Sequence, residues 1–153
     1  MGKIYIGSDH GGFEFKQRLT GLLKRQGYEM VDMGPLTYDK EDDYPDYAEK
    51  VCREILAWGG KGILICRSGH GMAITANKFP GIYASVCWNE ESAAKGKKDD
   101  NINVLCLPGD LITVEDAQRT VISWLNTPFE NIERRNRRMD KVRSIERRNF
   151  RQV

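Results

Sequence analysis

The segment Cys66-Arg67-Ser68-Gly69-His70-Gly71-Met72 concentrates groups that can do chemistry. It follows a short apolar run over 62–66 and opens a stretch with a helical pattern, so we expect it at the start of a helix. Backbone N–H groups at such a place bind anions and, with the cation of Arg67, favour a thiolate on Cys66. That thiolate could remove a proton next to a carbonyl, and Ser68 could pass a proton between neighbouring oxygens. A lone cysteine here would more often be a buried packing residue, but the serine and glycines around it favour the chemical interpretation.

A second polar segment, Gly7-Ser8-Asp9-His10-Gly11-Gly12, directly follows the apolar run over 3–7. Asp9 could orient a sugar hydroxyl or take part in proton transfer, and His10 could contact a phosphate. An equally good interpretation makes Asp9 a helix N-cap and the glycines turn formers. The spacing does not match the Gly-x-Gly-x-x-Gly pattern of dinucleotide-binding proteins.

Two further charged segments lie toward the end of the chain. The run 97–103 contains Asp99 and Asp100 and could reach a ligand of its own chain or of a neighbour, although a solvated loop is the simpler interpretation. The last predicted helix carries Arg134 and Arg138 one turn apart on one face, a spacing that suits a phosphate. A solvated helix face is the alternative. The pattern disfavours nucleic-acid binding, because no series of aromatic side chains accompanies the charge.

These segments need a scaffold, and the rest of the chain predicts one. Apolar runs alternate with helical patterns, which indicates a parallel sheet covered by helices on both faces. We expect strands over 3–7, 28–33, 62–66, 82–88 and 103–107, and a final basic helix that ends near Phe150. Ligands of open parallel sheets bind beyond the carboxyl ends of the strands, so the loops after the first, third and fifth strands should form the site.

Composition limits the class of protein. A chain of 153 residues, 40% hydrophobic and 30% charged, fits one domain over 1–153 with a sizeable core. Four cysteines without paired spacing and only two histidines predict reduced thiols and no metal site. No apolar run approaches the roughly 18 residues of a membrane span. Because the first residues also lack the shape of a signal peptide, we expect a cytoplasmic protein.

With these segments in this order, the chain resembles the type B ribose 5-phosphate isomerases and their relatives, the galactose 6-phosphate isomerase subunits and the allose 6-phosphate isomerases. The resemblance covers essentially the whole chain, and it also includes Asp43-Tyr44-Pro45-Asp46-Tyr47-Ala48, Ala76-Asn77-Lys78 and Asn103-Val104-Leu105. It implies a three-layer α/β/α Rossmann-like sandwich with a five-stranded parallel sheet and a C-terminal helix. It further implies a homodimer or homotetramer without metal or organic cofactor. The implied reaction is aldose–ketose isomerisation of a sugar phosphate, first of all ribose 5-phosphate, through a cis-enediolate.

The resemblance also implies roles for single residues. Cys66 is then the base that moves the proton between C1 and C2, Ser68 handles the hydroxyl proton, and the backbone of Gly69 to Met72 holds the enediolate. Met72 stands where another branch of the family has a catalytic Glu, so this chain resembles the Cys branch. The resemblance further implies that Asp9, His10, Arg134 and Arg138 contact sugar or phosphate, partly from a partner subunit. From their places in the loops we also expect ligand contacts by Tyr44, Arg67, His70, Gly71 and Asp100.

Four places depart from the family pattern. Arg67 replaces a frequent Gly, Asp99-Asp100 replace a His-Asn pair whose His opens the sugar ring, and Asp110 and Arg135 replace an Arg and a His. We hypothesise that Arg67 forms an ion pair with Asp99 or Asp100, and that Asp99 or His70 opens the ring. Two other functions stay open at this point: isomerisation of a different sugar phosphate, and non-catalytic binding of a sugar phosphate or a nucleic acid.

Overall fold

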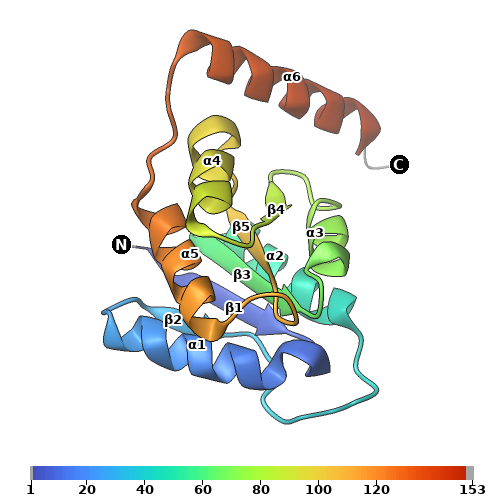
Figure 1. Ribbon diagram of the computed structural model, residues 1–153. Coiled ribbons are helices and arrows are strands. Elements are labelled where there is room, and N and C mark those ends of the chain that lie inside the picture. The colour runs from blue at the N-terminus through green and yellow to red at the C-terminus, as the bar shows by residue number, and fades with distance from the viewer. Residues whose placement is uncertain (1, 151–153) are drawn as a thin grey trace.

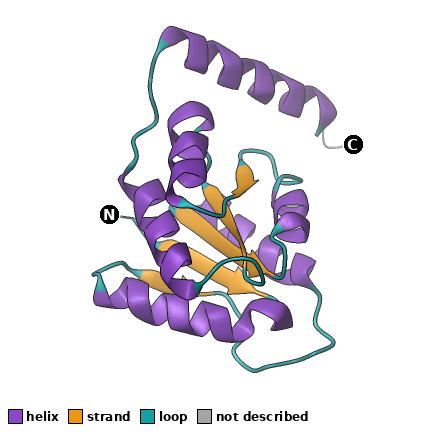
Figure 2. Ribbon diagram, viewed as in Figure 1, coloured by secondary structure: helices purple, strands orange, loops and turns teal. Residues whose placement is uncertain are grey.

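A five-stranded parallel sheet forms the centre of the protein, whose computed structural model describes residues 2–150 (Figures 1 and 2). The strands are β1 (Ile4–Ser8), β2 (Met30–Asp32), β3 (Lys61–Cys66), β4 (Ala84–Val86) and β5 (Val104–Pro108). They lie in the order β2-β1-β3-β5-β4, and every neighbouring pair is parallel. All five predicted strands are confirmed. The two edge strands, β2 and β4, are shorter than predicted.

Helices cover both faces of the sheet and make the predicted three-layer sandwich. They are α1 (Phe13–Arg25), α2 (Tyr44–Trp58), α3 (His70–Ala76), α4 (Glu90–Asp100), α5 (Val114–Asn126) and α6 (Glu133–Asn149), with a short 3-10 turn, η1 (His10–Gly12). The buried side chains of α1, α4 and α5 pack together on one face, and those of α2 and α3 pack on the other. The fold class predicted from the sequence is therefore confirmed.

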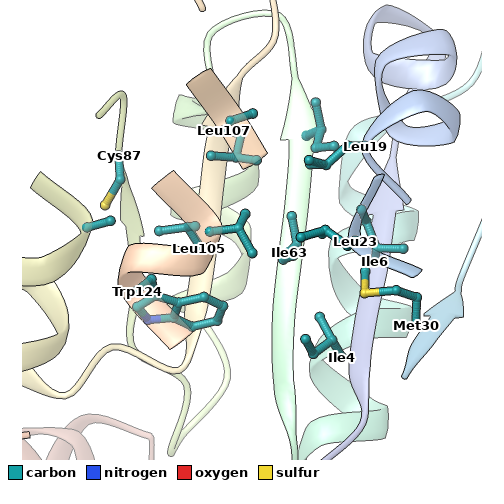
Figure 3. Packing of buried hydrophobic residues seen from close by; sticks show 14 of the residues in the cluster. Ile4, Ile6, Leu19, Leu23, Met30, Ile63, Cys87, Leu105, Leu107 and Trp124 are labelled. Atoms are coloured by element: carbon teal, nitrogen blue, oxygen red, sulfur yellow. The ribbon is translucent and has the colours of Figure 1, made fainter. Parts of the chain in front are cut away.

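The core explains why the central strands are apolar throughout rather than alternating. Successive strand residues point to opposite faces, so Ile63 packs toward α1 and α5 while Leu64 packs toward α2 and α3. Figure 3 shows Ile63 and Leu105 between the helical residues Leu23 and Trp124. Because both faces are covered, a polar residue on either side of these strands would be buried.

A fully buried lysine holds the segment that follows β2. The ammonium of Lys16, on α1, donates to Asp32 Oδ1 at 2.5 Å and to the carbonyl of Pro35 at 2.8 Å. The same Asp32 oxygen accepts the N–H of Gly34 at 2.9 Å. A buried charge needs such partners, so this group fixes the start of the loop that runs to α2.

The last helix lies apart from the carboxyl ends of the strands. Figure 1 shows α6 beyond α4, far from the arrowheads of β1 and β3. One side chain of α6, Met139, is buried. Within residues 2–150, no helix combines the length and apolar character that a membrane crossing requires.

Candidate active site

The loops after β1 and β3 meet at the point where the order of the strands reverses. From β1, the chain moves to β2 on one side, and β3 lies on the other. The N–H of Asp9 donates to the carbonyl of Ile65 at 3.4 Å, and the N–H of Gly109 donates to the carbonyl of Cys66 at 2.9 Å. The loops after the first, third and fifth strands therefore lie together, as predicted from the sequence.

Cys66 ends β3 with its sulfur against the first turn of α3. The side chain is buried, and its Sγ accepts the N–H of Gly69 at 3.1 Å. Gly69 has a φ of 79°, a left-handed conformation that turns the chain from strand to helix. The N–H of His70 donates to Ser68 Oγ at 3.4 Å. A backbone donor aimed at Sγ holds the sulfur at the start of α3.

The η1 turn brings a carboxyl group and an imidazole beside this loop. Asp9 is 8% exposed, and its Oδ1 accepts the N–H of Gly12 at 3.2 Å. Burial is the main cause that raises the pKa of Asp9 above its usual value. The N-cap interpretation of Asp9 is thus confirmed for the short turn. His10 is more open, and it lines a surface hollow with Tyr38 and Arg18.

Arg67 crosses over the η1 turn and pairs with an acid that the sequence analysis did not assign to it. A Cβ at Gly11 would lie 2.8 Å from Arg67 Cγ, so the arginine stem rests on that backbone. The guanidinium contacts Asp110 at 3.3 Å. The hypothesis that Arg67 pairs with Asp99 or Asp100 is wrong within one chain, where Asp99 pairs with Arg135 instead. Because β3 and β5 are neighbours, the loops that follow them meet, and residue 67 lies beside residue 110.

Tyr44 closes the site from α2. A Cβ at Gly71 would lie 2.6 Å from the Tyr44 ring, so this ring lies directly against the backbone of α3. Only glycine permits that approach. The aromatic face and the first-turn N–H groups of α3 therefore border the same space.

Four predicted site residues lie at the opposite end of the molecule. Asp99 and Asp100 end α4, which runs back from the carboxyl edge of the sheet, so they lie where β5 begins. Asp99 contacts Arg135 of α6 at 2.6 Å. Arg134 and Arg138 are exposed on α6, and within the described residues neither lies within 4 Å of an acidic group. One chain thus brings together the predicted residues from 9 to 72 and leaves those from 99 to 138 apart.

Two residues that the sequence analysis did not single out belong to the site. Asp42 accepts both the backbone N–H of His10 at 2.9 Å and the ring Nδ1 at 2.7 Å. Tyr47, on α2, lies against Asp42, and burial beside this carboxylate raises the pKa of Tyr47 to about 12. Asp42 precedes Asp43-Tyr44-Pro45 in an acidic loop, and only the fold shows that it reaches His10.

The arrangement can therefore supply a thiol held by a backbone donor, a hydroxyl, a buried carboxyl group, the cation of Arg67 and the imidazole of His10 around one edge of the sheet. Within residues 2–150, no three His, Cys, Asp or Glu side chains gather as a metal site would require. These groups suit proton transfer at carbon and the binding of an anion.

Comparison with known proteins shows that the chain is similar to sugar-phosphate isomerases. The sequence profile of a family described as Ribose/Galactose Isomerase matches residues 4–142. The chain is 36% identical to ribose-5-phosphate isomerase B of Escherichia coli K12 over 151 residues, 97% of this chain and 99% of that protein. It is 36% identical to ribose-5-phosphate isomerase B of Mycobacterium tuberculosis H37Rv over 146 residues, 95% of this chain and 90% of that one.

Solved structures similar to this chain carry the same name. Ribose-5-phosphate isomerase B of Clostridium thermocellum superposes with a TM-score of 0.91 at 36% identity, covering 96% of this chain and 99% of that one. The enzyme of Mycoplasma genitalium with bound ribulose-5-phosphate superposes with a TM-score of 0.89 at 37% identity, covering 95% and 96%.

Proposed function

Because the chain belongs to the ribose/galactose isomerase family, we propose that it interconverts ribose 5-phosphate and ribulose 5-phosphate. The observation that carries this proposal is the Cys66 sulfur held by the N–H of Gly69, at the carboxyl edge of the sheet. The relatives named ribose-5-phosphate isomerase B support the choice of substrate, and one of them was solved with ribulose-5-phosphate bound.

The proposed reaction moves one proton between two carbons. The Cys66 thiolate removes the proton from C2 of the open-chain aldose and returns it to C1, while Ser68 carries a proton between O2 and O1. The intermediate is an enediolate with negative oxygen. The N–H of Gly69 already serves Sγ, so the first-turn N–H groups of Gly71 and Met72 are the donors left for that oxygen.

The remaining groups on this edge would bind and orient the sugar phosphate. Asp9 is placed to bond sugar hydroxyls, and Tyr44 borders the space over Gly71. His10, Arg67 and His70 supply cationic or donor groups for the phosphate. Asp9 and the thiolate would repel each other if both were charged, and the raised pKa of Asp9 reduces that repulsion.

We also propose that the complete site forms between two copies of this chain. Asp99, Asp100, Arg134 and Arg138 lie at the opposite end from Cys66 in one chain, so they can serve a site only across an interface. A homodimer or homotetramer would satisfy this requirement. The arginines would then bind phosphate in the partner's site, and Asp99 or His70 remains the candidate for ring opening.

A different sugar phosphate is the second candidate, because of the acids at the far end. Asp99 and Asp100 stand where the resemblance places His-Asn, and Asp99 is bound by Arg135. A carboxylate paired with an arginine can only accept hydrogen bonds from sugar hydroxyls, whereas a neutral imidazole can both donate and accept. Purified protein should therefore be assayed with a panel of pentose and hexose phosphates. The highest kcat/KM on a hexose phosphate would replace ribose 5-phosphate as the assigned substrate.

The decisive experiment follows ribose 5-phosphate conversion by the wild type and by Cys66→Ala. We expect kcat to fall by about a thousandfold or more, since the base is removed, with little change in KM. Cys87→Ala is the matched control, because Cys87 is also buried but packs in the core on the other face of the sheet. Full turnover by Cys66→Ala would refute the assignment of the base.

A further inference from the structure

The loop after β2 reaches back to His10 through a single carboxylate oxygen. Asp42 Oδ1 lies 2.9 Å from the backbone N of His10 and 2.7 Å from its ring Nδ1. The Asp42 side chain is 6% exposed, whereas that of His10 is 27% exposed. Two donors from one residue converge on one acceptor, so both the position of His10 and the rotation of its ring are fixed.

The second oxygen of Asp42 makes this contact unusual. Asp42 Oδ2 is buried on the side of the carboxylate where Tyr47 lies. Burying a carboxylate costs stability, so a loop tether alone does not account for a charged group here. An amide or hydroxyl could accept the backbone N–H equally well. A negative charge adds something only for the imidazole, which can become a cation.

We propose that Asp42 is a positioning residue for His10, which holds the proton on Nδ1 and stabilises the imidazolium so that Nε2–H donates to the phosphate of the substrate. The inference rests on the proposed function for the identity of the anion, but its geometric part concerns only Asp42 and His10. Because a carboxylate accepts the Nδ1–H bond, the remaining ring nitrogen is the one available to a ligand.

Several charges around His10 decide its protonation. The hydrogen bond to Asp42 is the largest cause that raises the pKa of His10, and the charge of Asp9 acts in the same direction. Arg67, from the loop after β3, opposes them. From α1, Glu14 and Arg18 line the same hollow, with one charge of each sign.

The pH dependence follows from these charges. The imidazolium exists below the raised pKa, so binding of an anion is strongest there and weakens as pH rises through that pKa. Asp42→Asn should therefore lower the pH at which anion binding begins to weaken. The amide oxygen still accepts the backbone N–H, but the charge that stabilises the imidazolium is gone.

The first test needs no substrate. The chain has two histidines, so nitrogen-15 NMR of the wild type, with His70→Asn used only for assignment, reports the tautomer and pKa of His10. We expect the neutral ring to carry its proton on Nδ1, and we expect Asp42→Asn to lower the pKa. Asp39→Asn is the matched control, since Asp39 lies in the same loop and accepts the N–H of Glu41 instead. An Nε2–H tautomer in the wild type, or an unchanged pKa in Asp42→Asn, would overturn the proposal.

The second test uses inorganic phosphate. The pH should lie between the His10 pKa of Asp42→Asn and that of the wild type. There, Asp42→Asn should bind phosphate about five- to tenfold more weakly than the wild type, and the difference should vanish at lower pH. KM for ribose 5-phosphate should rise by a similar factor, with kcat within about twofold. A constant loss at every pH would mean a structural tether only and would refute the role. The NMR readout requires no turnover. A protein inactive on ribose 5-phosphate would therefore refute the proposed function, while the role of Asp42 would still be decided by the NMR measurement.

Discussion

Backbone rather than side chains holds the Cys66 sulfur. Its only hydrogen-bond donor within the described residues is the N–H of Gly69, and the neighbouring Ser68 Oγ accepts the N–H of His70. One reactive sulfur and one reactive oxygen thus accept hydrogen bonds from the backbone at one helix start, which cannot rotate as a side chain would. The proposed base and the proposed hydroxyl relay therefore keep a fixed relation to each other.

Ser68 should matter for rate more than for binding. We expect Ser68→Ala to lower kcat on ribose 5-phosphate by about a hundredfold, because the relay of the hydroxyl proton is lost, while KM changes little. Ser144→Ala on α6, whose hydroxyl bonds to Arg148, should leave kcat unchanged. Steady-state kinetics of the two variants decides the question, and a rise in KM alone for Ser68→Ala would assign Ser68 to binding.

At the scale of elements, the turn into α3 depends on a conformation that side chains avoid. Gly69 has a φ of 79°, and a Cβ there would lie 3.2 Å from Val86. Gly27 has a φ of 88° after α1, with nothing within 4 Å of an added Cβ. The two positions thus share the backbone requirement and differ in their surroundings.

This contrast gives a paired prediction. Gly69→Ala and Gly27→Ala should each lose about 1–2 kcal/mol of unfolding free energy from left-handed strain. Only Gly69→Ala should also lose most of its kcat, because the turn that carries the N–H to Cys66 shifts. Denaturant unfolding and kinetics of both variants measure this, and equal activity would show that the turn tolerates the shift.

Arg135 joins α6 to the rest of the molecule. Its side chain is 12% exposed and contacts Asp99 at 2.6 Å and Glu130 at 2.5 Å. The hydrogen bond from Arg135 is the main cause that lowers the pKa of Glu130. Arg137 offers a comparison, since it contacts Glu133 on the exposed side of the same helix.

The stability from this contact should depend on acidity. A carboxyl group with a lowered pKa contributes stability above its unfolded pKa, about 4.3 for Glu, and loses it as pH falls through the folded pKa. Arg135→Gln should therefore melt a few degrees below the wild type near neutral pH, and the difference should shrink below about pH 4. Arg137→Gln should melt like the wild type. A difference in melting temperature between Arg135→Gln and the wild type that stays constant across pH would exclude the ion pair as its source.

The elements were more predictable than their contacts. Apolar runs identify all five strands, because strands covered on both faces need uninterrupted apolar residues, as in Ile63 and Leu64. Glycine and histidine at a strand end identify the loop from Cys66 to Gly71. The partners of charged residues were not predictable, since the pairing of Arg67 with Asp110 depends on which strands are neighbours. Asp42 lies 32 residues from His10, and nothing local connects them.

At the scale of the whole molecule, the predicted phosphate ligands face away from the predicted base. Arg134 and Arg138 lie on α6, beyond α4, while Cys66 lies at the carboxyl edge of the sheet (Figure 1). A site that uses both sets joins two chains. Defects in different chains should then complement each other.

Mixing two inactive variants tests this arrangement. Cys66→Ala and the double variant Arg134→Ala/Arg138→Ala should each lose activity on ribose 5-phosphate. Unfolded and refolded together in equal amounts, they should recover about a quarter of wild-type activity, because half of the random dimers contain one intact site of two. Refolding each variant alone is the control. No recovery in mixtures shown to exchange subunits would place every essential group within one chain.

The position of α6 has a further consequence for how the protein behaves in dilute solution. A working site then needs the loops of one copy and the last helix of another. In dilute solution, the concentration of working sites is therefore proportional to the product of the concentrations of the two separate copies. Dilution would then lower turnover per chain while each chain keeps its fold. A slow regain of activity on reconcentration would measure the rate at which two copies meet.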